Sequence, residues 1–241
     1  MEKSLEGRTV LVTGANGGLG EHFVRQALER GARKVYAAAR SPRDWHDDRI
    51  TILQLDLTDA KSIADAATIA TDVDLLVNNA AIAPAGDSIS GPDEEMRRIF
   101  ETNFFGTMRL SNAFAPILAT HGGGTIVNIL SAAAWIGLGT AHSVSKTAMW
   151  SATNGLRFQL QGQKTQVIGV LVGMIDTPMS KRWDVPKVTA ESVVTQTYDG
   201  VVNGALEVLA DDDTRGLKAM LSTRAEELYP ALHQQLAFFK P

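Results

Sequence analysis

The sequence predicts an α/β fold, a doubly wound parallel sheet of about seven strands with helices on both faces. Three observations support this prediction. Short β-branched runs alternate with segments of helical hydrophobic period along most of the chain. A glycine-rich turn lies between the first such run and the first helical segment. The composition, with 44% hydrophobic and 21% charged residues, is typical of a globular protein.

Strands are predicted from short apolar runs between turn residues. They cover Thr9–Thr13, Lys34–Ala38, Ile50–Leu55, Val73–Val77, Thr125–Leu130, Gln166–Val172 and Ala205–Ala210. Helices are predicted from apolar residues three and four positions apart. They cover Glu21–Arg30, Asp59–Ala70 with Thr58 as its cap, Asp93–Leu118, His142–Gln161, Thr189–Gly204 and Asp211–Lys240, with Asp211–Asp213 as a solvated turn. Because strands and helices alternate, the strands are expected to be parallel and covered on both faces.

The chain length of 241 residues fits one large domain or two small ones. A division into two domains would need a linker near residue 120. The candidate there is Gly122–Gly124, which is too short to act as a linker. We therefore expect residues 1–241 to form a single domain.

Composition excludes several classes of function. The chain has no cysteine, so disulfides, thiolate metal sites and a cysteine nucleophile are excluded, and a reducing cytoplasm is the expected location. The net charge of −4, with Lys and Arg spread along the chain, argues against nucleic acid as a partner. The segments Ile126–Gly139 and Val167–Ile175 are shorter than the ~18 apolar residues of a membrane helix. Met1–Arg8 lacks the apolar stretch of a secretory signal.

The glycine-rich turn predicts an anion site. Gly14, Gly18 and Gly20 lie in the segment TGANGGLG, directly after the first strand. Small residues let an anion approach the free N–H groups at a helix start, and the first strand–helix turn of such a fold binds a dinucleotide pyrophosphate. The spacing is G-x-x-x-G-x-G, and the alternative interpretation is a purely structural turn.

Arg40 indicates which dinucleotide is bound. It lies about 20 residues beyond the glycine turn, where an acid would bind the ribose hydroxyls and an arginine would accommodate a 2′-phosphate. A guanidinium can pair with that phosphate through two hydrogen bonds. The sequence therefore favours NADP(H) over NAD(H) as cofactor. The alternative is an ordinary surface arginine close to Asp44.

These motifs, taken in order, resemble the classical short-chain dehydrogenase/reductase family. The resemblance rests on TGANGGLG, Asp56, Asn78-Asn79-Ala80-Ala81, Asn103, Ser131 and Lys146. It implies a Rossmann-like fold and transfer of a hydride between a nicotinamide and a carbonyl or secondary alcohol. The cofactor-binding set that we expect is Gly14, Asn16, Gly18, Leu19, Gly20, Arg40, Asp56, Leu57, Asn78, Ala80, Lys146, Gly173, Ile175 and Thr177.

Within this set the resemblance assigns roles. Asp56 is expected to hold the adenine amino group, and Asn78 and Ala80 to line the adenine ribose. Gly173–Thr177 is expected to surround the nicotinamide end. Val172 stands where the family usually has proline, a change that loosens this loop but keeps the Thr177 hydroxyl available.

The family's catalytic tetrad is matched at three of its four positions. Asn103, Ser131 and Lys146 correspond to its asparagine, serine and lysine. The tyrosine of Y-x-x-x-K is replaced by His142, four residues before Lys146 and so on the same face of a helix. The interval from Ser131 to His142 is also shorter than is usual in the family.

Histidine changes the acid–base chemistry expected at this position. Positive neighbours lower the pKa of a phenol usefully, but they push the pKa of an imidazole below its reference of about 6.5. A neutral His142 would be a poor proton donor and would end roughly 2 Å short of a phenol oxygen, a gap that a water could bridge. Three hypotheses stay open: an altered acid–base group, a crippled reductase that only binds cofactor or ligand, and a pocket used for non-redox lyase or isomerase chemistry.

Two other kinds of site are disfavoured. Ser131 and His142 do not match the sequence motifs of serine hydrolases. Ser131 does not lie in a G-x-S-x-G motif, and no motif places an acid to orient the histidine. A metal site is also not expected, since the other histidines lack a ligand spacing. They are His22, His46, His121 and His233.

The segment between Thr177 and Thr189 is expected to cover the substrate. It is short, which predicts an open pocket with Ser131, Met179 and Trp183 as substrate contacts. A moderately large apolar ketone or alcohol would suit such a pocket.

Two helical stretches have apolar faces suited to contacts between subunits. They are Met96–Leu118 and Ala148–Leu160. With the resemblance they predict a homo-oligomer, a dimer or tetramer, although both faces could simply cover the sheet.

Overall fold

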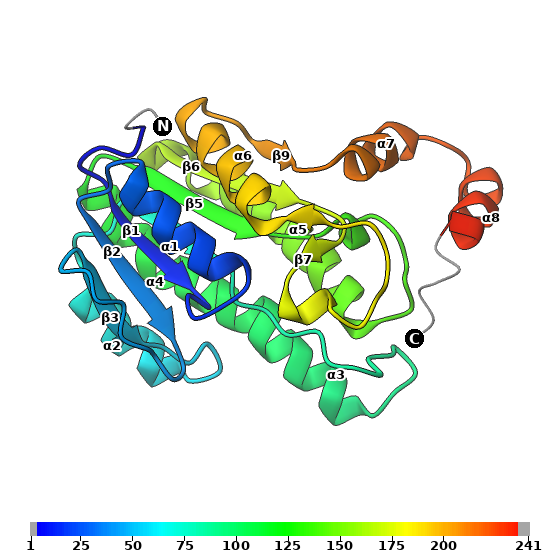
Figure 1. Cartoon of the computed structure of the whole chain (residues 1–241), viewed down its shortest axis with the longest axis horizontal. Coiled ribbons are helices and arrows are strands. Elements are labelled where there is room, and N and C mark those ends of the chain that lie inside the picture. Colours follow the sequence, from blue (N-terminus) through cyan, green and yellow to red (C-terminus); the bar gives the residue numbers. More distant parts are fainter. Residues whose placement is uncertain (1–3, 236–241) are drawn as a thin grey trace.

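A seven-stranded parallel sheet forms the centre of the computed structural model, which describes residues 4–235 (Figure 1). Its strands are β1 (Thr9–Thr13), β2 (Lys34–Ala39), β3 (Ile50–Gln54), β4 (Leu75–Asn78), β5 (Gly124–Ile129), β6 (Thr165–Leu171) and β9 (Glu207–Leu209). They lie in the order β3-β2-β1-β4-β5-β6-β9. The strand order reverses between β1 and β4, which is the switch point where doubly wound folds bind ligands. The predicted fold class is confirmed.

Helices cover both faces of the sheet. On one face lie α1 (Leu19–Glu29) and α6 (Ala190–Val202), and on the other lie α2 (Ala60–Ile69), α4 (Thr107–Thr120) and α5 (Ala141–Gln159). Neighbouring strand residues alternate between the two cores, so that Val10 and Val12 pack toward α1 while Leu11 packs toward α2 and α4. The central strands, which are buried on both faces, are therefore mainly apolar. Between residues 4 and 235, no helix is both long and apolar enough to cross a membrane.

The helix predicted over Asp93–Leu118 is interrupted. It consists of α3 (Asp93–Phe100), a π-helical segment η1 (Glu101–Gly106) and α4. The interruption coincides with close packing on the loop after β3, because a Cβ on Gly106 would lie 2.4 Å from the Leu57 oxygen. Asn103 lies in this π-helical segment and is only 2% exposed. A π-bulge inside a helix is frequent at functional sites.

The predicted cap of α2 is wrong by one residue. Asp59 is the cap, because its carboxylate accepts a hydrogen bond of 2.8 Å from the Lys61 backbone N–H. Thr58 instead donates its hydroxyl and backbone N–H to Asp56, at 2.7 and 2.9 Å.

The stretch predicted to be helical over Asp211–Lys240 is divided into two helices in its described part. The described part contains α7 (Asp212–Met220) and α8 (Ala225–Gln235), which lie at one end of the molecule (Figure 1), and residues 236–240 fall outside the described range. Asp211 is not solvated but buried, since it caps α7 and accepts the Gly173 N–H at 2.7 Å.

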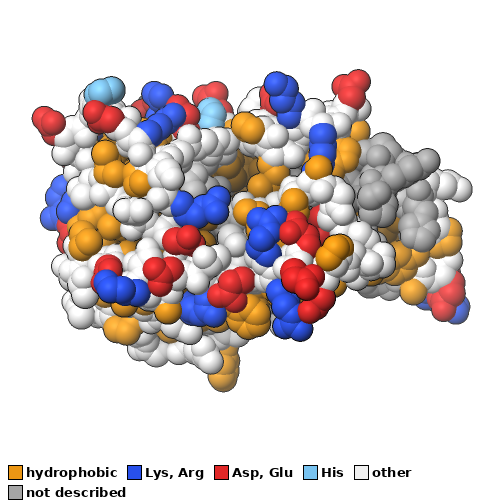
Figure 2. Space-filling model, turned by 90° about the horizontal axis from the view of Figure 1, so that it is seen from below, with side chains coloured by type: hydrophobic (Ala, Val, Ile, Leu, Met, Phe, Trp, Pro, Cys, Tyr) orange, Lys and Arg blue, Asp and Glu red, His pale blue; other side chains and the backbone are white. Residues whose placement is uncertain are grey.

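The segment expected to cover the substrate is attached at both ends. The short strands β7 (Ile175–Asp176) and β8 (Val188–Thr189) pair with each other, so the ends of the segment lie side by side. A single 3₁₀ turn, η4 (Pro178–Ser180), follows β7. The face of the molecule seen in Figure 2 is hollowed, with hydrophobic side chains lying in the hollow among charged ones.

Candidate active site

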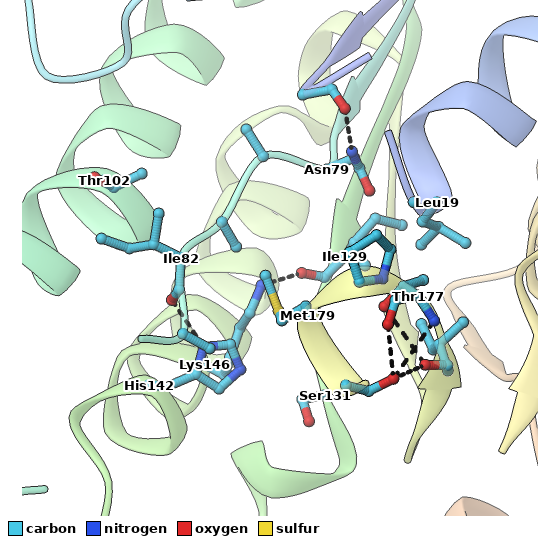
Figure 3. A pocket seen from close by; sticks show the side chains of 18 of the residues that line it. Leu19, Asn79, Ile82, Thr102, Ile129, Ser131, His142, Lys146, Thr177 and Met179 are labelled. Atoms are coloured by element: carbon cyan, nitrogen blue, oxygen red, sulfur yellow. Dashed lines mark hydrogen bonds between the residues drawn. The ribbon is translucent and has the colours of Figure 1, made fainter. Parts of the chain in front are cut away.

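A cavity of about 1210 Å³ runs along the carboxyl edge of the sheet, from the glycine turn to the segment after β7. Most of the predicted site residues line it, and Figure 3 shows several of them around one space. The predicted residues that line it are Gly14, Asn16, Gly18, Leu19, Arg40, Asp56, Leu57, Ala80, Ser131, His142, Lys146, Gly173, Ile175, Thr177, Met179 and Trp183. Three predicted residues, Gly20, Asn78 and Asn103, do not line the cavity.

The glycine turn has the shape that a pyrophosphate site requires. A Cβ on Gly20 would lie 2.1 Å from the Gly14 oxygen, so this position is closed to any other residue. Gly14 and Gly18 adopt φ angles of 64° and 52°, which favour glycine. Asn16 has a buried side-chain oxygen without a hydrogen-bond partner. The turn therefore has room and unused polar capacity for a bound group, and the residues present fit a dinucleotide.

Arg40 and Asp56 follow β2 and β3, on the opposite side of the switch point from Ser131, which follows β5. Arg40 is exposed and has no ion-pair partner within the part of the chain that the structure describes. The hydrogen bonds from Thr58 lower the pKa of Asp56, and the charge of Arg40 lowers it further. An unpaired guanidinium at the rim of a cavity is available to an anionic group.

Asn78 lies in the interior instead of the cavity wall. Its amide donates to the Ser111 hydroxyl at 3.0 Å and to the Asn128 side-chain oxygen at 2.8 Å. Its neighbour Asn79 lines the cavity and donates to the Thr13 oxygen at 2.8 Å, which joins the ends of β4 and β1. The sequence motif thus places one asparagine in the core and the next at the site.

Helix α5 positions the candidate catalytic pair one turn apart. Its first turn is capped by Thr140 and by Asp87, whose carboxylate accepts the backbone N–H groups of Ala141 and His142 at 2.9 and 2.8 Å. Asp87 is a buried residue 55 positions away from His142, and nothing in the sequence pattern marks it. Lys146 donates to the Ile129 oxygen at 2.6 Å, and burial lowers its pKa to about 8.

The His142 ring is held by a backbone carbonyl. Its Nδ1 lies 3.1 Å from the Ile82 oxygen, and the ring lies close to Lys146 in Figure 3. Burial, and then the charge of Lys146, lower the pKa of His142 to about 4. The sequence predicts this direction from positive neighbours alone, and the structure adds burial as the larger cause. Asn103 reaches the same carbonyl from η1, donating to the Ile82 oxygen at 2.9 Å.

Ser131 follows β5 and lines the cavity. Its hydroxyl oxygen accepts the Ala133 N–H at 3.1 Å, which leaves its own proton available to a ligand oxygen. Ser131 and His142 both line the cavity, and both are labelled in Figure 3.

The lowered pKa of His142 has a consequence for stability in acid. In the unfolded chain His142 has the reference pKa of about 6.5. Between about pH 6.5 and pH 4 the unfolded chain therefore binds more protons than the folded chain. The free energy of unfolding should therefore decrease as the pH falls through this range, by about 3 kcal/mol for the titration of His142. Between these two pH values, the free energy of unfolding of His142→Asn should decrease by less than that of wild type. Urea unfolding at both pH values measures this difference. His121→Asn changes an exposed histidine and serves as the control. Its free energy of unfolding should decrease by as much as that of wild type.

The fold and the site together define an α/β protein whose cavity at the sheet edge joins a glycine turn that fits a dinucleotide to a serine, a histidine and a lysine. The chain belongs to the short-chain dehydrogenase family, whose profile matches residues 8–187. It is 34% identical to "Short-chain dehydrogenase PC-15" of Penicillium crustosum over 188 residues, covering 72% of this chain and 68% of that one. It is 30% identical to "1-deoxy-11-beta-hydroxypentalenate dehydrogenase" of Streptomyces avermitilis, covering 86% and 83%. A crystal structure of a short chain dehydrogenase from Burkholderia cenocepacia J2315 in complex with NADP superimposes with a TM-score of 0.87 and 36% identity, covering 98% and 99%.

Proposed function

We propose that this protein is an NADP(H)-dependent oxidoreductase that acts on a carbonyl or secondary alcohol. The observation that supports this most directly is a single cavity that joins the glycine turn to Ser131, His142 and Lys146. The family membership and the NADP bound to the Burkholderia cenocepacia relative support the same conclusion. We further propose that the whole chain acts as one domain.

The chain's own residues have separate roles in this proposal. The glycine turn binds the pyrophosphate, Arg40 the 2′-phosphate, and Lys146 the nicotinamide ribose. The cofactor, when bound, supplies or accepts a hydride. Ser131 donates its hydroxyl to the substrate oxygen, and His142 exchanges a proton with that oxygen directly or through a water.

Turnover distinguishes this function from its alternatives. The protein is mixed with NADPH and a panel of ketones, and with NADP⁺ and the matching alcohols, while the absorbance of the reduced cofactor is followed. Turnover with any pair supports the oxidoreductase. NADPH binding without turnover, in wild type and in His142→Tyr alike, would favour a cofactor-binding protein, and conversion of substrate without redox change would favour a lyase or isomerase.

Replacing Arg40 by aspartate should reverse the choice of cofactor. The wild type should be stabilised more by NADPH than by NADH in thermal-shift measurements, because the guanidinium pairs with the 2′-phosphate. In Arg40→Asp a carboxylate faces that phosphate, so NADPH affinity should fall by about tenfold or more while NADH affinity is kept. Arg109→Asp, the same charge change on α4, should alter neither shift. Equal shifts in the wild type would contradict the role of Arg40.

The substrate end of the cavity supports an apolar substrate of moderate size. It is lined by Ile136, Leu138, Met174, Met179 and Trp183. Met179 is 44% exposed, as expected for a contact that a substrate would cover.

We also propose that the protein is a homo-oligomer. Phe105, in η1, is 47% exposed, and Phe158, on α5, is 81% exposed. Both lie in the stretches whose apolar faces predict subunit contacts.

A further inference from the structure

The contact between His142 and Ile82 determines which ring nitrogen carries the proton. Nδ1 lies 3.1 Å from the backbone oxygen of Ile82. A carbonyl oxygen has no proton to donate, so Nδ1 must be the donor. A neutral imidazole has one N–H group, and Nε2 therefore keeps a lone pair.

The carbonyl that selects this tautomer is itself held in place. The Asn103 side chain accepts the Ile82 N–H at 2.8 Å and donates to the Ile82 oxygen at 2.9 Å. The same amide donates to the Ser145 hydroxyl at 3.1 Å, which ties it to α5. Because Asn103 binds both the N–H and the C=O of Ile82, the Ile82 oxygen stays directed at the ring, and the opposite tautomer would lose its partner.

The charges that face His142 favour its neutral form. Lys146 lies on the same helix, and Arg182 acts from the segment after η4; both disfavour an imidazolium. Asp87 favours it, but its carboxylate is occupied by two backbone N–H groups of α5. With burial included, the pKa of His142 is about 4, so the ring is neutral near pH 7.

We propose, resting on the oxidoreductase function above, that His142 Nε2 is a general base and that the chain works at neutral pH as an alcohol dehydrogenase. The substrate O–H bond breaks and its proton goes to Nε2. The adjacent C–H bond breaks and its hydride goes to the oxidised cofactor, while the electron pair left on oxygen forms the C=O bond. The imidazolium then releases the Nε2 proton to water.

The two directions of this reaction need different forms of His142. Oxidation needs the neutral ring, which is the main form near neutral pH. Reduction needs the imidazolium, whose population falls about tenfold with each pH unit above its pKa. The initial rates of the two directions should therefore depend on pH in different ways.

The tautomer is measured on the protein without cofactor. In ¹⁵N-histidine-labelled protein, the His142 signals are assigned by their absence in His142→Asn. At about pH 7 we expect a protonated Nδ1 and an unprotonated Nε2, which have well separated ¹⁵N shifts. A protonated Nε2 overturns the proposal, whether or not the enzyme turns over.

The catalytic role is measured in both directions between about pH 6 and pH 8. Wild-type oxidation of the alcohol should stay nearly constant, while ketone reduction falls by about a hundredfold over this range. His142→Asn keeps an N–H group for Ile82 but has no atom at the Nε2 position, so oxidation should fall by about 10² to 10⁴. His121→Asn is the matched control and should keep the wild-type rate.

Reduction that is as fast at pH 8 as at pH 6, or oxidation that survives His142→Asn, overturns the role of Nε2. Failure of the wild type and of His142→Tyr to turn over in either direction would instead contradict the oxidoreductase function, and the two failures are thereby distinguished.

Discussion

His142→Tyr should increase ketone reduction at neutral pH by about a hundredfold or more. A phenol carries its proton at pH 7, and the Lys146 ammonium lowers its pKa toward neutrality, so it can protonate the substrate oxygen. His142, neutral and with its only N–H group directed at Ile82, cannot. The phenol oxygen also reaches roughly 2 Å farther into the cavity than an imidazole nitrogen. The measurement is the rate of NADPH consumption with a ketone at saturating cofactor.

A matched control shows whether this gain is local. His121→Tyr makes the same exchange at an exposed residue outside the cavity, and its reduction rate should equal that of wild type. An unchanged rate in His142→Tyr, with turnover present in wild type, would mean that the proton comes from another group. The gain should reside in kcat and not in KM, because the donated proton acts on the transition state.

Gly20→Ala should disable the glycine turn. In a helix this exchange normally stabilises by about 1 kcal/mol. Here the added Cβ would lie 2.1 Å from the Gly14 oxygen and 2.8 Å from the Gly14 carbonyl carbon, so the backbone of the turn must move. Overpacking of this kind costs about 1–3 kcal/mol or more, which outweighs the gain in propensity. We expect a lower melting temperature and an NADPH affinity reduced by more than about tenfold.

Gly17→Ala is the control in the same turn. A Cβ on Gly17 meets no atom within 4 Å, so the melting temperature of the cofactor-free protein should be unchanged. If Gly20→Ala melted and bound NADPH like wild type, the close approach of α1 to the Gly14 oxygen would not be needed for the site.

Local patterns identify part of the candidate site. The glycine turn, Arg40 and the pair of His142 and Lys146 can be predicted because each depends on residues close together in sequence. A spacing of four residues places two side chains on one helix face in any fold that keeps the helix. Asn103 is harder to predict, because a single polar residue in a helical stretch forms no recognisable pattern. Its hydrogen-bond partner, Ile82, is seen only in the structure, where Asn103 lies in η1.

The partners of His142 cannot be predicted in this way. Ile82 is 60 residues from it and contributes a backbone oxygen, which any residue type has. Asp87 resembles any loop aspartate until α5 places two N–H groups against it. The buried role of Asp211 is likewise visible only when Gly173, 38 residues away, donates to it.

The sequence by itself determined the α/β class, the glycine-rich turn after the first strand and the placing of His142 and Lys146 on one helix face, because these follow from the periodicity and order of residues along the chain. Only the tertiary structure decided the protonation and orientation of that histidine. Burial, a distant carbonyl and the neighbouring cations act through space, and their effect on an imidazole depends on distances that the chain order does not specify.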